Sequence, residues 1–335
     1  MVIKENIPLA SYTTFRIGGP ARYFCTVKNE EELIDAVHFA KERELKIFAL
    51  GGGSNILVSD EGFFGLVIKM EILGLVFEGE KVTVSSGELW DSVVEQCVER
   101  GLYGIENLSA IPGCAGAAPI QNIGAYGVDI SETIETVRVY DTQTEKFLTM
   151  TNEECKFGYR DSIFKRDKSR FIVSSITLKL QKNGIVNISY RDLDTYFKAK
   201  KNPTPRIEEV RQAVIDIRWN KLPDWKLWGT AGSFFKNPII SASHYTELKK
   251  SYHDLPGFSE PDGRIKVPLG WILDNICHMK GMTAGHVGTH DKQALVIVTK
   301  PGATAAEVVS VSQGLIRAVK EKTNIEVEGE VEWVV

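Results

Sequence analysis

The chain has 335 residues, a length that predicts two or three domains rather than one small core. Hydrophobic residues make up 43% and charged residues 25%, which is the ordinary balance of a soluble globular protein. The formal net charge of −4 argues against a broad nucleic-acid surface, because such a surface needs an excess of basic residues.

The five cysteines are sparse, odd in number and never spaced as a C-x-x-C pair. Residues 1–8 contain no long apolar run after the lysine, and no stretch of about 18 apolar residues occurs anywhere in the chain. We therefore expect reduced thiols in a cytoplasmic protein that is not inserted in a membrane.

The N-terminal part of the sequence predicts a β-α-β unit. An apolar strand is expected over 21–27, and Asn29 then caps a helix whose first turn holds three glutamates. The next strand, over 46–50, runs directly into Gly51, so the unit ends in a glycine-rich turn. Further elements are expected as strands over 67–70 and 82–85 and as a helix over 90–100.

The middle of the chain has mostly strand patterns, and the C-terminal part has the pattern of a separate α/β unit. In the middle we expect a hairpin over 137–141 and 146–149, strands over 171–180 and 185–190, a polar connector over 196–206 and a helix over 207–218. After Pro238 we expect helices over 242–252, 271–277 and 304–322, and strands over 293–298 and 325–335.

Two loops are built from unusually small residues. Gly51–Asn55 follows a strand, and its consecutive glycines allow backbone amides to approach an anion closely. The segment over 111–127 is also rich in glycine and alanine, which permits close approach of a flat ligand. A plain tight turn and simple loop packing explain the two loops equally well when each is taken alone. Together the loops suit a dinucleotide.

Two further segments place a reactive polar group beside aromatic residues. Arg160 in YRDSIFK is a permanent cation, and Ser233 in GTAGSFFKNP is a small hydroxyl that can release a proton. With the glycine-rich loops, they indicate a reductase that adds hydride and a proton across a polarised double bond. Outside such motifs, an arginine usually forms a surface salt bridge, here with Asp161 or a neighbour, and a serine usually lies in a Gly-Ser turn.

Six segments resemble the UDP-N-acetylenolpyruvoylglucosamine reductase (MurB) family, in its longer, type I form. They are spread over nearly the whole chain: 14–19, 51–55, 111–127, 157–165, 232–238 and 293–298. The resemblance implies an α+β and α/β protein with a two-part FAD-binding domain of the vanillyl-alcohol-oxidase (PCMH) type and a C-terminal α/β substrate-binding domain. The implied FAD-binding subdomains are residues 1–66 and 67–218, and the implied substrate-binding domain is residues 219–324. Whether the C-terminal strand over 325–335 joins the first subdomain stays open.

The resemblance also implies an activity: reduction of UDP-N-acetylglucosamine enolpyruvate to UDP-N-acetylmuramate in peptidoglycan synthesis. Noncovalent FAD would be the cofactor and NADPH the reductant. The cofactor residues implied are Gly51, Gly52, Gly53, Ser54, Asn55, Pro112, Gly113, Gly116, Gly124 and Tyr126.

The resemblance assigns roles to three catalytic residues. Arg160 would stabilise the enolate-like charge, since its donor fork suits a carboxylate. Ser233 would give a proton to the α-carbon, and Glu330 would support the enol intermediate. Glu328 stays open as an alternative to Glu330, because residues two apart on a strand share a face.

Four residues match substrate contacts of the family. Tyr190 would close over the diphosphate from a mobile loop, Lys221 would meet phosphate charge, and Asn237 and Gln293 would hold the sugar nucleotide. Without the resemblance, Tyr190 reads as a core or rim tyrosine, Lys221 as an exposed lysine and Gln293 as the polar start of a strand. Three tryptophans crowd the segment before Gly229: Trp219, Trp225 and Trp228.

His286 and His290 are four residues apart, but the segment between them reads as loop or strand and forms no HExxH motif, so no metal is expected. Cys114 is expected to be a small buried thiol. Two other functions stay open: a flavin-dependent oxidase of the same fold, and a nucleotide-sugar binder without turnover. We expect a monomer that binds no nucleic acid.

Overall fold

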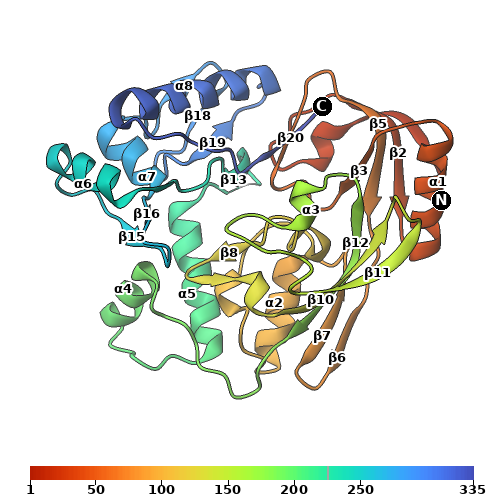
Figure 1. Ribbon diagram of the computed structural model, residues 1–335, viewed down its shortest axis with the longest axis horizontal. Helices are drawn as coiled ribbons and strands as arrows, with labels where there is room; N and C mark the ends of the chain where they lie inside the picture. The colour runs from red at the N-terminus through yellow and green to blue at the C-terminus, as the bar shows by residue number, and fades with distance from the viewer. Residues whose placement is uncertain (225) are drawn as a thin grey trace. The chain divides into compact units, whose positions relative to one another are not determined.

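The computed structural model describes residues 1–224 and 226–335; Trp225 lies outside the described residues. The chain divides into two compact units, each assembled from segments that are separate in sequence. The first unit comprises residues 1–7, 21–53 and 64–220, and the second unit comprises residues 8–20, 54–63 and 221–335. Figure 1 labels their helices and strands.

The first unit contains a four-stranded sheet covered by one helix. Its strands, in spatial order, are β1 (Lys4–Pro8), β2 (Pro20–Val27), β5 (Phe63–Met70) and β3 (Ile47–Leu50). Helix α1 (Glu30–Glu42) begins where the side chain of Asn29 accepts a hydrogen bond from the Glu32 amide, so the predicted cap is confirmed. The apolar face of α1 packs with residues of β2 and β5 in one core cluster.

A five-stranded antiparallel sheet forms the larger core of the first unit. Its order is β11 (Lys146–Thr151), β10 (Ile134–Asp141), β12 (Phe171–Lys179), β7 (Lys81–Ser85) and β6 (Leu75–Glu78). The predicted hairpin is confirmed, with Asp141 opposite Lys146 at its turn. Helix α2 (Trp90–Glu99) buries its apolar face in the same cluster as this sheet.

The first unit also contains several short elements and two helices that lie side by side in Figure 1. The short elements are η2 (Glu106–Leu108), η3 (Ala115–Ala117), β8 (Gly124–Ala125), β9 (Val128–Asp129), η4 (Ile130–Glu132) and α3 (Ile163–Arg166). The two helices are α4 (Arg191–Ala199) and α5 (Ile207–Lys221), which share an apolar cluster that includes Leu193, Phe197 and Val214.

Two predictions for this region are wrong. Residues 185–190 form no strand, because Val186 and Ile188 pack against the α4–α5 cluster instead of pairing with a neighbouring strand. The polar connector predicted over 196–206 begins inside α4, because Leu193 and Phe197, one helical turn apart, give that segment a buried face.

The second unit contains two small sheets, a further pair of strands described below, and several helices of different lengths. One sheet has the order β13 (Gly229–Ser233), β19 (Val296–Thr299), β18 (Val287–Thr289) and β17 (Thr283–Ala284), and the other has the order β14 (Ile239–Ile240), β16 (Ile265–Lys266) and β15 (Phe258–Ser259). The helices are η1 (Leu9–Tyr12), α6 (Ala242–Ser251), α7 (Leu269–Trp271) with its π-helical continuation η5 (Ile272–Ile276), and α8 (Ala305–Thr323).

The longest helix of the second unit, α8, begins at a capping box in which Thr304 and Glu307 satisfy each other's backbone amides. Its buried face packs with strands β18 and β19 in one core cluster. In the part of the chain that the structure describes, no helix combines the length and the apolar character needed to cross a membrane.

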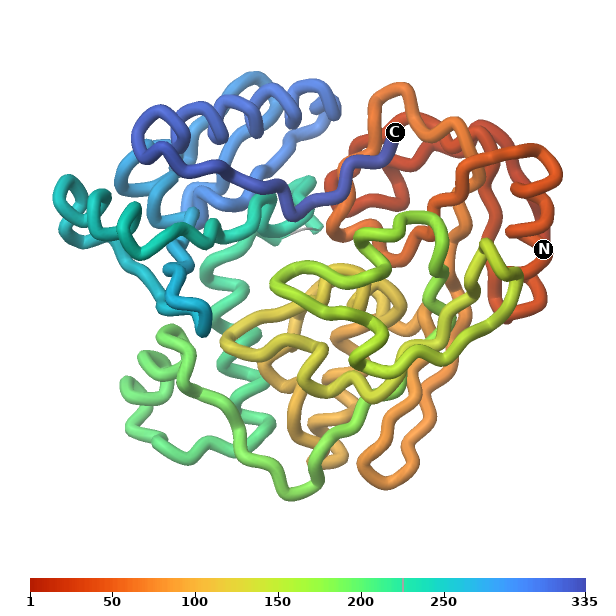
Figure 2. Tube along the Cα trace, viewed as in Figure 1, coloured from red at the N-terminus to blue at the C-terminus, as the bar shows by residue number. Residues whose placement is uncertain are grey.

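The last residues form strand β20 (Glu332–Val334), which pairs in parallel with β4 (Ile56–Val58), as the trace in Figure 2 shows. The strand predicted over 325–335 is therefore much shorter than expected. Asn324 adopts a left-handed conformation after α8, and Ile325 then turns into the core. The strand predicted from Gln293 begins only at Val296, because the Val296 amide donates back to the Gln293 carbonyl in a turn.

A substitution at Gly314 can test the packing of α8. It is half-buried inside the helix, and a Cβ added there meets no atom within 4 Å outside the helix's own backbone. We expect Gly314→Ala to raise the free energy of unfolding by about 0.5–1 kcal/mol, since glycine is a poor helix former. Thermal and urea unfolding measure the change.

The matched control is Gly229→Ala in β13. A Cβ there would overlap the Thr299 hydroxyl and the Phe15 carbonyl, so this variant is expected to be less stable than the parent protein. A fall in stability for Gly314→Ala would contradict the packing described for α8.

Candidate active site

The two glycine-rich loops meet through their backbones within the first unit. A Cβ added to Gly52 would lie 2.7 Å from the Cα of Gly113, and one added to Gly51 would lie 3.3 Å from the Cβ of Ala117. Glycine is therefore required at residue 52 for the loops to approach this closely. The predicted residues Gly51, Gly52 and Gly113 are brought together, with Gly53 and Pro112 next to them in sequence.

Lys69 brings positive charge to the first glycine-rich loop. It is half-buried in β5, and its Nζ donates a 2.6 Å hydrogen bond to the carbonyl of Gly51. Lys69 was not among the residues predicted from the sequence. Its signal was a lysine inside the otherwise apolar strand FFGLVIKM. A cation beside backbone amides favours an anionic ligand such as a phosphate.

Ser86 supplies an unsatisfied polar group beside the second loop. A Cβ added to Gly116 would lie only 2.5 Å from the Cβ of Ser86, so loop and serine are in close contact. Ser86 is 1% exposed, and its hydroxyl has no hydrogen-bond partner in the described part of the chain. A buried hydroxyl without a hydrogen-bond partner is uncommon in folded proteins, and one explanation is that it binds a ligand. The close cradle and the unsatisfied hydroxyl fit a bound dinucleotide.

Arg160 is held in one orientation by three acceptors. Its Nη2 donates to the Gly124 carbonyl, and its Nη1 donates to Asp129 at 3.2 Å and to the Asn122 carbonyl at 3.4 Å. The side chain is 17% exposed, and its φ of 52° lies in the left-handed region. Asp161, considered above as its partner, forms an ion pair with Arg166 instead.

Gly124 makes room for this guanidinium. A Cβ at residue 124 would overlap the Asp129 carboxylate and lie 2.6 Å from Nη1 of Arg160. Gly124 was predicted as a cofactor residue; its contacts in the structure are with the arginine. Asp129 was missed, because one aspartate in a loop carries no distinctive sequence signal.

Tyr126 and Tyr190 form an aromatic pair. Their rings meet edge to face, with centroids 5.5 Å apart, and Tyr190 precedes helix α4. Burial raises the pKa of the Tyr190 phenol, Asp192 and Tyr159 raise it further, and the Arg160 cation lowers it. Burial likewise raises the pKa of Tyr126 to about 12, so both phenols are neutral at pH 7.

In the second unit, Ser233 and Glu330 lie on adjacent segments. Ser233 ends β13 opposite Val296, after an irregularity in the strand where Gly232 has a φ of 72°. The amide of Glu330 donates a 2.9 Å hydrogen bond to the carbonyl of Phe234, the residue after Ser233. Bulges of this kind commonly redirect a side chain at a functional site.

Asn55 and Glu328 complete the surroundings of Glu330. The Nδ2 of Asn55 donates to the Glu330 carbonyl at 3.2 Å, so this residue of the first loop segment lies beside Glu330 in the second unit. Ser54 precedes it in the same unit. The carboxylate of Glu328 forms a 2.6 Å ion pair with Lys236 and is 73% exposed.

The two predicted amide residues of the second unit each lie beside the start of α7. Asn237 accepts a 3.0 Å hydrogen bond from the Leu269 amide, and a Cβ on Gly270 would lie 2.5 Å from the Oε1 of Gln293. Lys221 is the exposed last residue of α5. The predicted residues are thus divided between the two units.

No group of three or more histidine, cysteine or acidic side chains among the described residues is arranged to hold a metal ion. His286 and His290 lie at either end of β18 and contact different carboxylates, Glu307 at 3.4 Å and Asp291 at 3.1 Å.

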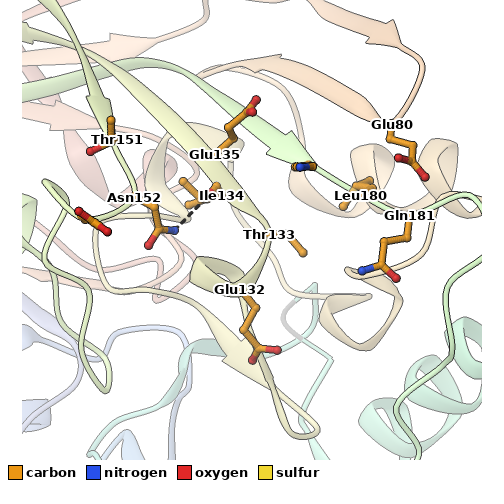
Figure 3. A pocket seen from close by; sticks show the side chains of 11 residues that line it. Glu80, Glu132, Thr133, Ile134, Glu135, Thr151, Asn152, Leu180 and Gln181 are labelled. Carbon is orange, nitrogen blue, oxygen red and sulfur yellow. Dashed lines mark hydrogen bonds between the residues drawn. The ribbon is translucent and has the colours of Figure 1, made fainter.

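A pocket of about 650 Å³ lies elsewhere on the first unit, as Figure 3 shows. Its lining contains four glutamates and one lysine, and none of the predicted site residues belongs to it: Glu80, Glu132, Glu135, Glu153 and Lys179 are its charged residues. Because its carboxylates would repel a diphosphate, we do not assign the substrate to this pocket.

Comparison with known proteins finds two families along the chain. Residues 21–150 match the FAD binding domain, and residues 223–334 match the C-terminal domain of UDP-N-acetylenolpyruvoylglucosamine reductase. The predicted fold class, a two-part FAD-binding domain followed by a C-terminal domain of helices and strands, is confirmed.

Reductases of the same name match nearly the full length of the chain. The reductase of this name from Neisseria gonorrhoeae is 38% identical over 99% of this chain and 97% of its own length, and the one from Pseudomonas aeruginosa is 35% identical over 98% of both. The crystal structure of the Thermus caldophilus reductase matches all of both chains with a TM-score of 0.71 at 26% identity.

The contact between Lys69 and the first loop predicts a role in FAD affinity. We expect Lys69→Met to weaken FAD binding about tenfold, since it removes a half-buried cation from the loop. Titration of the apoprotein, followed by quenching of flavin fluorescence, measures the dissociation constant at low and high salt.

Lys46→Met is the matched control, because Lys46 is an exposed lysine of the same unit. Lys69→Arg should keep most of the affinity. If both methionine variants bound FAD equally well, Lys69 would have no role in the cofactor site.

Proposed function

The chain belongs to the UDP-N-acetylenolpyruvoylglucosamine reductase family, and we propose that it reduces UDP-N-acetylglucosamine enolpyruvate to UDP-N-acetylmuramate in peptidoglycan synthesis. The observation that carries this proposal is the full-length match, which includes both the FAD binding domain and the family's C-terminal domain. NADPH is the reductant and FAD the cofactor.

The glycine-rich loops and their neighbours hold the cofactor in this proposal. Gly51–Gly53 offer backbone amides to the pyrophosphate, with Pro112, Gly113, Gly116, Ser54, Asn55 and Tyr126 as further contacts, and Lys69 adds positive charge. When bound, FAD supplies hydride transfer from NADPH to the β-carbon of the enolpyruvyl group.

Arg160 stabilises the negative charge that develops on the substrate. Hydride addition at the β-carbon leaves an electron pair at the α-carbon, which spreads into the adjacent carboxylate. A fixed guanidinium stabilises this charge more than a mobile cation does, because no reorganisation is needed as the charge forms. The hydrogen bonds to Gly124 and Asp129 support this role, because they fix the guanidinium before substrate binds.

Ser233 donates the proton that completes the reduction at the α-carbon, and Glu330 supports the enol. The adjacency of the Ser233 and Glu330 segments supports a joint role. Glu328 is less suited to it, because its carboxylate pairs with Lys236 and is largely exposed. A serine hydroxyl is a weak acid, so a neighbouring group must help to replace its proton.

Tyr190, Lys221, Asn237 and Gln293 bind the sugar nucleotide in this proposal. The shared position of Asn237 and Gln293 at the start of α7 supports one amide-lined contact surface. Lys221 is exposed and cationic, which suits a diphosphate.

We also place the enzyme in the cytoplasm as a monomer. All five cysteines are free and buried, which fits a reducing compartment.

The proposed function is tested by mixing photoreduced, FAD-loaded protein with UDP-N-acetylglucosamine enolpyruvate in the absence of oxygen. Rapid reoxidation of the flavin, with formation of UDP-N-acetylmuramate, is expected. A flavin that stays reduced until oxygen is admitted would identify an oxidase, and protein that takes up no FAD would identify a binding protein without turnover.

Ser233→Ala separates the two half-reactions. Flavin reduction by NADPH should stay within twofold, because it needs no proton at the α-carbon, whereas reoxidation by substrate should slow about 10²–10⁴-fold. Stopped-flow absorbance at the flavin band measures both rates.

Ser310→Ala, at an exposed position of α8 in the same unit, is the control and should change neither rate. Equal slowing of both half-reactions in Ser233→Ala would show that Ser233 is structural.

A further inference from the structure

Asn107 is a buried asparagine that joins two functional segments of the first unit. It is 1% exposed, and its Nδ2 donates to the carbonyl of Tyr126 at 2.9 Å and to the carbonyl of Asn187 at 2.8 Å. Tyr126 belongs to the second glycine-rich loop, and Asn187 lies three residues before Tyr190. One side chain thus connects the loop assigned to the cofactor with the segment assigned to substrate.

Asn187 strengthens the same connection from the other side. Its Nδ2 donates to the carbonyl of Gly127 at 3.2 Å, and its Oδ1 accepts from the amide and the hydroxyl of Ser189 at 3.1 and 2.7 Å. We call Asn107 and Asn187 the clasp. The clasp fixes residues 187–189 against residues 126–127 at several points.

The clasp determines where Tyr190 lies. Residues 184–190 form no strand or helix, so no backbone ladder locates this segment, whose course is visible in Figure 2. Beyond the clasp, the ring of Tyr190 rests edge-on against that of Tyr126, and Ile188 packs against the α4–α5 cluster. In this position the Tyr190 phenol lies within electrostatic range of Arg160, whose charge lowers the pKa of the phenol.

One polar atom of Asn107 is left without a partner. Its Oδ1 is buried and accepts no hydrogen bond in the described part of the chain. A buried unpaired acceptor costs about 1–3 kcal/mol, so this asparagine is not the choice that stability alone would favour. The two bonds donated by Nδ2 therefore have a purpose other than filling the core.

We propose that the clasp is a positioning device that holds Tyr190 in the conformation that binds the sugar nucleotide. The proposal rests on the proposed function, in which Tyr190 contacts the diphosphate. Asn107 is buried and is not among the residues assigned to cofactor or substrate, so its proposed action is through Tyr190. If Tyr190 is released, its binding-competent position is populated for a smaller fraction of the time, and the apparent affinity for substrate falls by that fraction.

The test replaces Asn107 by leucine, which has a similar volume but cannot donate. We expect Asn107→Leu, measured in the FAD-saturated enzyme, to raise KM for UDP-N-acetylglucosamine enolpyruvate about tenfold while kcat stays within twofold, since substrate binding is lost and chemistry is not. Asn187→Ala, at a half-buried position, breaks the clasp from the other side and should raise KM in the same direction.

Asn152→Leu is the matched control. Asn152 also bridges two carbonyls, those of Ser131 and Ile134, each at 2.8 Å, but it lines the pocket of Figure 3 and does not contact the Tyr190 segment. It should lower stability without changing KM. Equal KM values for the Asn107 and Asn152 variants would overturn the proposal.

A mutant cycle with Tyr190→Ala shows whether the clasp acts through the tyrosine. In that background Asn107→Leu should leave KM unchanged, because no tyrosine remains to be positioned. An additive rise in KM would give Asn107 a merely structural role. These outcomes are distinct from failure of the proposed function, in which the unaltered enzyme itself would not reoxidise with substrate.

Discussion

The hydrogen bonds that fix the Arg160 guanidinium are the constraint on which the rest of the site depends. Its guanidinium reaches the Gly124 carbonyl and the Asp129 carboxylate, which requires that residue 124 carry no Cβ. The arginine also adopts a left-handed backbone conformation, which costs a non-glycine residue about 1–2 kcal/mol. Strain of this kind persists where the surroundings enforce it, commonly at functional sites.

Similar contacts recur in the first unit, where loops are fixed by backbone contacts and by hydrogen bonds from polar side chains to backbone carbonyls. Gly52 lets two loops touch, Lys69 holds the Gly51 carbonyl, and Asn107 holds the Tyr126 carbonyl. Each contact fixes a loop through its main chain, which leaves the loop surface open for a ligand. Preorganisation of this kind lowers the cost of binding and of charge stabilisation.

The sequence predicted well those helix starts that depend on residues within one turn of the helix. Asn29 and Thr304 cap helices because their side chains satisfy amides within the next turn. The strand predicted over 185–190 is absent, because Val186 and Ile188 alternate like a strand but pack on helices that come later in the chain. Residues of the site with motif neighbours, such as Arg160, could be identified by resemblance. Asp129, Ser86 and Asn107 could not, because their importance arises from contacts with residues far away in sequence.

The central claim is that a guanidinium held in one orientation, and not simply a positive charge, stabilises the transition state. The measurement is the rate at which UDP-N-acetylglucosamine enolpyruvate reoxidises the reduced flavin of Arg160→Lys in anaerobic stopped flow. Since lysine keeps the charge but loses the paired donors, the account predicts a rate about 10²–10³-fold below that of the parent enzyme, with reduction by NADPH unchanged. A reoxidation rate within threefold of the parent enzyme would contradict the account.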